Sequence, residues 1–433
     1  MKNKVNDKPI TISTEELYSQ LDNPNLKLID VRPADAYNGW KFNDEIRGGH
    51  IKNAKSLPFK WLRYLDWMDI VHVKNISKHD TLIVYGCDNA ETENVVKHFI
   101  HVGYNDVKVY NDFVSEWSSN PGLPMSFLKR YRQLVGAKWL KRLIETDNAD
   151  EYDNNDYVIC HAHYQNPDDY RKGHIPGAIE LDTNTLESIQ TWNRRSPEEI
   201  EKTLTSTGIT KDTTVILYGR FSFPDNEDPF PGSSAGQLAA MRCAFIMMYA
   251  GVQDVRILNG GLQSWEDEGY SITTSVTVKR PVSASGAAIP QNPQFAVDLP
   301  GAKEILSSDD ANLISVRSWQ EFIGEVSGYN YIYRKGRIPG AIFGNCGSDA
   351  YHLENYRNLD HTMREYHEIL KLWADAGITP DKHNTFYCGT GWRASEAFFY
   401  AWLMGWPRVS VFDGGWFEWS NDENNPIETG IPS

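Results

Sequence analysis

The stretch Thr385-Phe386-Tyr387-Cys388-Gly389-Thr390-Gly391-Trp392-Arg393 passes from an apolar run, through a turn with two glycines, into the helix-forming run 394–399. Such a strand–turn–helix directs backbone N–H groups and the positive helix end at the first residue of the turn, here Cys388. This environment stabilises a thiolate relative to a thiol. A lone cysteine can also be a small buried apolar residue. The two glycines and Arg393 favour a nucleophilic Cys388 instead.

Length and charge restrict the classes of protein that fit. A chain of 433 residues is too long for one hydrophobic core, and we expect about three domains. The net charge of -15, with no cluster of Lys and Arg, argues against a nucleic-acid partner. No P-loop or dinucleotide fingerprint is present, so we expect no cofactor.

The chain shows no targeting or membrane signal. Residues 1–14 are charged and lack an apolar core, and the longest apolar run, 238–251, is short and contains Arg242. The five cysteines are scattered without a C-x-x-C pair, which argues against disulfides and a zinc cluster. His161 and His163 have metal-ligand spacing, but no further ligand accompanies them. We therefore expect a cytoplasmic protein without membrane contact or bound metal.

One sequence pattern occurs three times. In each copy a tryptophan lies six residues after Asn or Asp: Asn111 to Trp117, Asn259 to Trp265 and Asp413 to Trp419. An apolar strand that ends in tyrosine precedes each of these segments, at Tyr85, Tyr218 and Tyr387. From tyrosine to tryptophan the interval is 32 residues in the first and third copies and 47 in the second. Repeats of this kind indicate three copies of one structural unit.

Within each copy, strands alternate with helical stretches such as 198–205 and 363–376, a pattern typical of an α/β unit with a mainly parallel sheet flanked by helices. We expect domains at 1–127, 128–275 and 295–433, with a linker rich in Ser, Ala, Pro and Gly before the third. The second copy carries an insertion near 220–237. We interpret it as a surface loop, with a lid over the third copy's site as the alternative.

The repeated elements resemble a known family. Asp30-Val31-Arg32, Gly173-His174-Ile175-Pro176-Gly177-Ala178, Asp413-Gly414-Gly415 with Trp419, and the C-G-x-G loop at Cys388 are similar to motifs of the rhodanese family of sulfurtransferases. The three-copy layout resembles the three-domain bacterial thiosulfate or 3-mercaptopyruvate sulfurtransferases. The resemblance implies three tandem rhodanese-like domains, of which the first two are inactive and the third is catalytic.

The third copy alone has a cysteine at the active position. Gly86 and Gly219 occupy the corresponding places in the first and second copies. Cys87 lies one residue later among carboxylates, which would raise the pKa of its thiol. We therefore expect the chemistry at Cys388.

The resemblance implies a reaction in two steps. Cys388 accepts sulfur from a small anionic donor, thiosulfate or 3-mercaptopyruvate, and the resulting persulfide passes it to cyanide or to a thiol, protein thiols included. The other loop residues are assigned to substrate binding: Gly389, Thr390, Gly391, Trp392 and Arg393.

Two residues outside the loop are also candidates. By resemblance, Arg317 either binds the carboxylate of the substrate or holds the loop. His174 matches a histidine that faces the neighbouring copy's cysteine in tandem members of the family, and a purely structural role is the alternative. We expect the site in a cleft between the second and third copies, with His174 and Arg220 reaching toward Cys388.

Two rival functions fit parts of the pattern. Cysteine phosphatases also use a cysteine in an N–H cradle with an arginine, but five residues then separate the two, whereas four separate Cys388 from Arg393 and Ala394 occupies the phosphatase position. A non-catalytic rhodanese-like interaction protein would fit the first two copies, but not the intact loop of the third.

Overall fold

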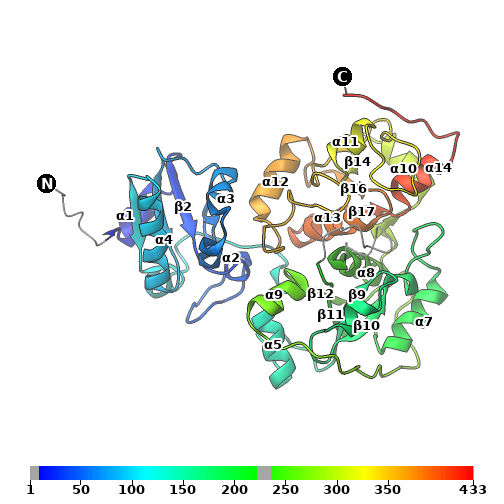
Figure 1. Cartoon of the computed structure of the whole chain (residues 1–433), viewed down its shortest axis with the longest axis horizontal. Coiled ribbons are helices and arrows are strands. Elements are labelled where there is room, and N and C mark those ends of the chain that lie inside the picture. Colours follow the sequence, from blue (N-terminus) through cyan, green and yellow to red (C-terminus); the bar gives the residue numbers. More distant parts are fainter. Residues whose placement is uncertain (1–8, 222–235, 433) are drawn as a thin grey trace. The chain divides into compact units, whose positions relative to one another are not determined.

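The computed structural model describes residues 9–221 and 236–432. The chain forms two compact units, Met1–Arg132 and Gln133–Ser433. The first unit contains the first repeat, and the second unit contains the other two repeats (Figure 1). Most of the insertion near 220–237 lies outside the described residues. None of the helices described is long and apolar enough to cross a membrane.

Each repeat is built on a five-stranded parallel sheet with the same strand order. The first sheet has the order β1-β6-β5-β2-β4, with β1 Ile10–Thr11, β2 Leu26–Asp30, β4 Lys55–Ser56, β5 Thr81–Tyr85 and β6 Val107–Tyr110. The second has the order β8-β12-β11-β9-β10, with β8 Leu134–Val135, β9 Tyr157–His163, β10 Ile179–Asp182, β11 Thr214–Tyr218 and β12 Asp254–Leu258. The third has the order β13-β17-β16-β14-β15, with β13 Ala296–Val297, β14 Ala311–Ser315, β15 Ile342–Phe343, β16 His383–Tyr387 and β17 Val409–Phe412. A small antiparallel pair, β3 His50–Ile51 and β7 Met125–Ser126, completes the first unit.

Helices connect the strands. The first repeat has α1 Thr14–Gln20, α2 Ala34–Asn38, α3 Trp67–Val73 and α4 Asn89–His101. The second has α5 Ala137–Thr146, α6 Asp168–Arg171, α7 Pro197–Thr207, α8 Gly236–Ala250 and α9 Gly261–Asp267. The third has α10 Leu299–Leu306, α11 Trp319–Ile323, α12 Tyr366–Asp375, α13 Trp392–Leu403 and α14 Gly415–Asn421. The remaining turns are η1 Phe59–Arg63, the π-helical η2 Phe113–Trp117, η3 Tyr131–Gln133, η4 Thr183–Thr185 and η6 Pro293–Phe295.

The central strands explain why the sheets are parallel. Strand β11 reads Thr-Val-Ile-Leu-Tyr and is buried along its whole length. Continuous apolar runs of this kind suit a parallel sheet covered on both faces. Within the second unit, α8 and α13 pack against each other (Figure 1). The ring centroids of Phe245 and Phe398, one on each helix, lie 5.5 Å apart. This helix pair joins the second repeat to the third.

The repeated tryptophan closes each repeat. The indole N–H of Trp117 donates to the carbonyl of Pro124 at 3.3 Å. Trp265 donates in the same way to Ser271 at 3.1 Å, and Trp419 donates to Pro426 at 2.9 Å. All three side chains are buried, so the signature found in the sequence anchors the segment that leaves each repeat.

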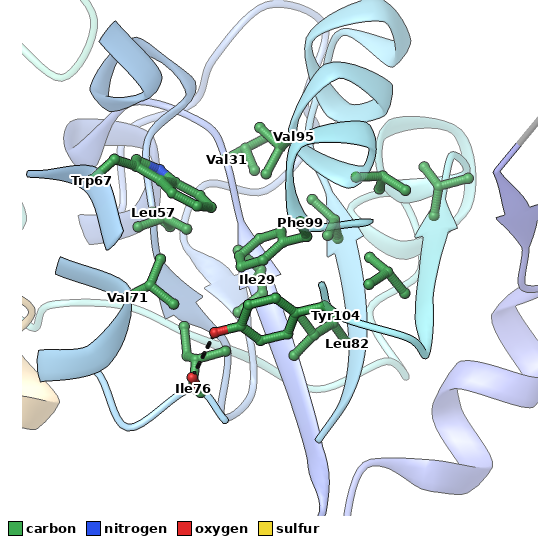
Figure 2. Packing of buried hydrophobic residues seen from close by; sticks show 14 of the residues in the cluster. Ile29, Val31, Leu57, Trp67, Val71, Ile76, Leu82, Val95, Phe99 and Tyr104 are labelled. Carbon is green, nitrogen blue, oxygen red and sulfur yellow. Dashed lines mark hydrogen bonds between the residues drawn. The ribbon is translucent and has the colours of Figure 1, made fainter. Parts of the chain in front are cut away.

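The core of the first unit gathers buried aromatic and aliphatic side chains between its sheet and its helices. Figure 2 shows Phe99 from α4 near Ile29 and Tyr104 in this core. The hydroxyl of Tyr104 donates to the carbonyl of Ile76 at 2.9 Å, so its polar end is satisfied inside the core. Phe99 has no exposed surface, whereas the next residue, Ile100, is 45% exposed.

This contrast gives a test of the core. The substitution Phe99→Ala should lower the free energy of unfolding of the first unit by about 3 to 5 kcal/mol, because it leaves a cavity. Hydrogen exchange at the amides of β5 measures this free energy. The control Ile100→Ala should change it by less than about 1 kcal/mol. Equal effects of the two substitutions would show that Phe99 does not lie in the core.

Candidate functional site

Cys388 follows β16 directly, and α13 begins four residues later at Trp392. The cysteine is fully buried. Gly391, the N-cap of α13, has a φ of +87°, in the left-handed region that favours glycine. A Cβ atom there would lie 2.8 Å from Nη1 of Arg242 and 2.8 Å from the carbonyl oxygen of Asp413. The tight turn after the cysteine therefore requires a glycine at position 391.

The peptide groups of the loop are held from one side. The carbonyl of Cys388 accepts a hydrogen bond from the N–H of Trp416 at 2.8 Å, and the carbonyl of Gly389 accepts one from Phe417 at 2.9 Å. In a trans peptide the following N–H points the opposite way, so the N–H groups of Gly389 and Thr390 point away from α14. Among the described residues, none accepts a hydrogen bond from the N–H of residues 389 to 391. Successive N–H groups that point to one side of a turn in this way are suited to interact with an anion.

Two arginines near the loop share one carboxylate. Arg393 donates to both oxygens of Glu321, each at 2.9 Å, and Nε of Arg317 lies 3.3 Å from Oε1 of Glu321. All three side chains are buried. Burial alone would raise the pKa of Glu321, but Arg393 and Arg317 outweigh it and lower that pKa to about 2. Arg393 and Arg317, both expected from the sequence, therefore contact Glu321, and their charge is partly neutralised.

Tyr329 lies directly beside the cysteine loop. A Cβ atom on Gly389 would lie 2.2 Å from a ring carbon of Tyr329, and the Tyr329 hydroxyl accepts a hydrogen bond from Arg393 at 3.0 Å. The hydroxyl hydrogen has no acceptor among the described residues. Burial raises the pKa of Tyr329, and the nearby charges of Cys388 and Glu321 raise it further while Arg393 opposes them. Tyr329 therefore stays protonated and can donate a hydrogen bond near Cys388.

Neither Tyr329 nor Glu321 was expected at the site from the sequence. Gly328, with a φ of +84°, lets the chain pass over Glu321: a Cβ atom there would lie 2.3 Å from Oε1. This close approach brings Tyr329 to Arg393. The only signal in the sequence is the tyrosine-rich run 329–333 after a glycine.

Aromatic rings surround the site from two repeats. Their centroids follow one another at 5.3 Å (Tyr329 to Tyr331), 5.4 Å (Tyr331 to Trp192), 5.3 Å (Trp192 to Tyr164) and 5.5 Å (Tyr164 to Trp392). Burial raises the pKa of Tyr331, and the neighbouring tyrosines and Cys388 raise it further. We call these five residues the aromatic wall.

His174 occupies a different environment from the one expected. Its ring stacks on Tyr170 at 3.7 Å, and its nitrogens lie 2.9 and 3.1 Å from the carbonyl oxygens of Tyr170 and Ser275. His50 makes the equivalent stack on Tyr37 in the first repeat. These contacts hold His174 within its own repeat, and no described contact joins it to residues 388–391. Arg220 likewise donates to the carbonyl of Gly173 at 2.9 Å.

The other thiols lie in environments that favour the protonated form. The Cys87 thiol donates to Glu45 at 2.7 Å, and burial and Glu45 raise its pKa. Cys160, Cys243 and Cys346 are buried, and burial raises the pKa of each. In the part of the chain that the structure describes, no three His, Cys, Asp or Glu side chains are grouped to hold a metal ion.

Comparison with known proteins identifies relatives of the whole chain. The rhodanese-like domain family matches residues 13–120, 136–268 and 299–422. The chain is 39% identical over 427 residues to thiosulfate sulfurtransferase YnjE of Escherichia coli (strain K12), a match that spans 98% of this chain and 92% of the relative. It is 30% identical over 327 residues to sulfur carrier protein TtuD of Thermus thermophilus, which spans 69% of this chain and 96% of the relative.

Solved structures resemble the chain over its full length. One is an anaerobic ergothioneine biosynthesis enzyme from Chlorobium limicola in complex with its natural substrate, trimethyl histidine. It is 57% identical, with a TM-score of 0.96, and the match covers 98% of this chain and 100% of that chain. Another is an EanB variant with a cysteine persulfide in a tetrahedral intermediate state with ergothioneine, also 57% identical, with a TM-score of 0.96 and the same coverage.

The pairing of Glu321 predicts a pH-dependent stability. Its pKa falls from 4.5 to about 2 on folding, so its contribution is complete above pH 4.5 and is lost as the pH falls toward 2. At pH 7, Glu321→Gln should lower the free energy of unfolding by about 3 to 5 kcal/mol, because two buried arginines lose their partner. Urea denaturation at several pH values measures this difference in unfolding free energy between wild type and Glu321→Gln, which should become smaller below pH 4.5. The control Glu325→Gln changes an exposed carboxylate and should leave the free energy of unfolding unchanged. A destabilisation by Glu321→Gln that does not vary with pH would contradict the pairing of ionised Glu321 with the two arginines.

Proposed function

The chain belongs to the rhodanese-like domain family, and we propose that it is a sulfurtransferase that moves sulfane sulfur through a persulfide on Cys388 to the imidazole ring of trimethyl histidine. The observation that carries the choice of acceptor is the surroundings of Cys388: an aromatic wall beside arginines that are already paired.

Sulfur uptake uses the N–H cradle. The thiolate of Cys388 attacks the outer sulfur of a sulfane donor, the S–S bond of the donor breaks, and the leaving group departs with the electron pair. With thiosulfate, the leaving group is sulfite. The anionic persulfide then lies against the free N–H groups of residues 389 to 391. Thiosulfate is favoured as the donor by the name of the E. coli relative, with 3-mercaptopyruvate as the alternative.

The charges and rings around the loop favour an acceptor that carries a quaternary ammonium group. Arg393 and Arg317 are paired with Glu321, so neither guanidinium is free to clamp an anionic acceptor. The faces of aromatic rings attract quaternary ammonium groups, and the aromatic wall supplies five rings. Trimethyl histidine carries such a group, and the Chlorobium limicola enzyme binds it.

Two residues near Cys388, one in the loop and one far before it in the sequence, match the EanB structures in spacing. In those variants a substituted tyrosine precedes the persulfide cysteine by as many residues as Tyr329 precedes Cys388. A substituted threonine follows that cysteine by two residues, as Thr390 follows Cys388. These matches support a shared substrate class and the proposed roles of Tyr329 and Thr390 in it.

The transfer step balances without an external reductant. A ring carbon of the imidazole forms a bond to the outer sulfur, and the S–S bond breaks with its electron pair left on Sγ of Cys388. The ring carbon loses its proton, so the products are a sulfur-bearing imidazole and the free cysteine. The Tyr329 hydroxyl, which stays protonated, donates a hydrogen bond to charge that develops during this step.

The first test removes the nucleophile. Cys388→Ser should abolish both the sulfur adduct and the turnover of trimethyl histidine, because an alcohol oxygen does not carry sulfane sulfur. Intact-mass analysis after incubation with thiosulfate measures the adduct. Liquid chromatography with mass spectrometry measures sulfur on trimethyl histidine, on cyanide and on a small thiol in parallel. Cys87→Ser serves as the control and should behave as wild type.

Two outcomes of this test count against the proposal. An adduct that persists in Cys388→Ser would place the nucleophile elsewhere. Transfer to cyanide or to the thiol with no product from trimethyl histidine would reject the proposed acceptor and leave a general sulfurtransferase.

The second test separates the two half-reactions at Tyr329. Tyr329→Phe should slow transfer from the persulfide to trimethyl histidine by about 10- to 100-fold, because the hydroxyl donor is lost while the ring remains. Loading of Cys388 with sulfur, followed by intact mass, should be unchanged. Tyr333→Phe, an exposed tyrosine in the same run, is the matched control. Equal transfer rates in Tyr329→Phe and wild type would remove Tyr329 from the mechanism.

A further inference from the structure

The second repeat has Gly219 where a nucleophile would stand, yet its side chains reach the loop of the third repeat. Both carboxylate oxygens of Glu187 accept the indole N–H of Trp392, each at 3.0 Å. Trp392 is the first residue of α13, two residues after Thr390. Nε of Arg242 donates to the same carboxylate at 2.9 Å, and both Glu187 and Arg242 are fully buried. Glu187 is thus fixed by Arg242 of its own second repeat and binds Trp392 of the third repeat.

Arg242 extends this connection beneath the loop. Its Nη2 lies 2.7 Å from Oδ1 of Asp413, which is also fully buried. A Cβ atom on Gly391 would lie 2.8 Å from Nη1 of Arg242, so the guanidinium lies directly against the turn. Arg242 therefore bridges carboxylates of the two repeats while it packs against Gly391.

Asp413 connects the network to the cysteine itself. It begins the Asp-Gly-Gly turn into α14, and the N–H groups of Trp416 and Phe417 from α14 bind the carbonyls of Cys388 and Gly389. A second arginine of the second repeat, Arg194, donates to Asp413 at 2.9 Å. The position of the turn behind the cysteine thus depends on charges supplied by the second repeat.

The third repeat contains the same kind of ion pair with the charges reversed. Arg242 and Glu396 lie equally far before the tryptophan that closes their repeats, and their partners are Glu187 and Arg357. Arg357 donates to Glu396 at 2.7 Å, and Glu396 is fully buried. Among the described contacts, neither Arg357 nor Glu396 binds a residue of 388–393. The chain therefore offers a matched pair that stabilises the fold without touching the loop.

We propose that Glu187 and Arg242 are positioning residues for the reaction at Cys388: the second repeat, which has Gly219 at the active position, fixes the orientation of Trp392 and the turn at Gly391. This inference rests on the proposed role of Cys388 as the sulfur carrier. A displaced loop would misplace the N–H cradle relative to the sulfur, and misplacements of about 1 Å cost up to about 100-fold in rate. The substitutions should therefore act on rate through geometry, beyond any loss of stability.

The experiment compares Glu187→Gln with Glu396→Gln in the full-length protein. Each replaces one carboxylate of a buried ion pair, so both should lower the melting temperature. The rate of sulfur loading of Cys388 from thiosulfate, followed by intact mass well below either melting temperature, is the deciding measurement. Glu187→Gln should load about 10- to 100-fold more slowly than wild type, and Glu396→Gln should load as wild type does.

A second variant covers the case in which Glu187→Gln folds poorly. Trp392→Phe keeps an aromatic ring but removes the N–H that Glu187 binds, so it should slow loading too. Its effect should be much smaller in a Glu187→Gln background, because the two act through one hydrogen bond. Additive effects, or equal slowing by Glu187→Gln and Glu396→Gln, would show a merely structural role and overturn the inference. Failure of wild type to load sulfur would instead reject the proposed function.

Discussion

The buried carboxylate of Glu321 sets both the shape and the charge of the loop around Cys388. It accepts the N–H of Ser318 at 2.9 Å and both N–H groups that Arg393 directs at it. Arg317 lies against its other side. Because buried charges are tolerated only when paired, these residues hold α11, α13 and the cysteine loop that precedes α13 in one arrangement. The arrangement also brings Tyr329 to Arg393 and leaves little free positive charge for an anionic acceptor.

The three repeats share a fold but contribute different residues to the candidate site. The third supplies the cysteine and its N–H cradle, and the second supplies Tyr164, Trp192, Glu187 and Arg242 around the same loop. The second repeat has Gly219 at the position of Cys388, and its side chains fill the space against which the loop packs. The first repeat keeps the sheet order and the closing tryptophan, and its thiol, Cys87, donates to a carboxylate. Sequence similarity between repeats therefore preserves packing more faithfully than chemistry.

The sequence predicted the parts of the structure that depend on local patterns. The strand that ends at Tyr387, the turn at Cys388 and the helix that follows it were all expected, as were the helices near 198–205 and 363–376, observed as α7 and α12. Three repeats were visible because the same tryptophan closes each one. The predicted insertion near 220–237 falls largely on residues that the structure does not describe.

Other residues of the candidate site could not be predicted, because they reach the loop through contacts between distant parts of the sequence. Glu321 and Tyr329 lie more than fifty residues before Cys388, and Glu187 lies in another repeat. Their roles arise from close approaches at glycines and from buried pairs. His174 was a candidate for contact across repeats, with a structural role as the alternative, and its ring nitrogens lie against carbonyl oxygens of its own repeat. Arg393 was assigned to substrate binding, and its guanidinium contacts Glu321.

The most direct test of the account is a single turnover from isolated persulfide. The protein would be loaded with ³⁴S-labelled sulfane sulfur, freed of donor by gel filtration and mixed with trimethyl histidine. The account predicts that the label leaves the Cys388 peptide and appears on the imidazole ring in equal amount, with no added reductant. Label that remains on Cys388 in the presence of trimethyl histidine, but leaves when cyanide or a thiol is added, would contradict it.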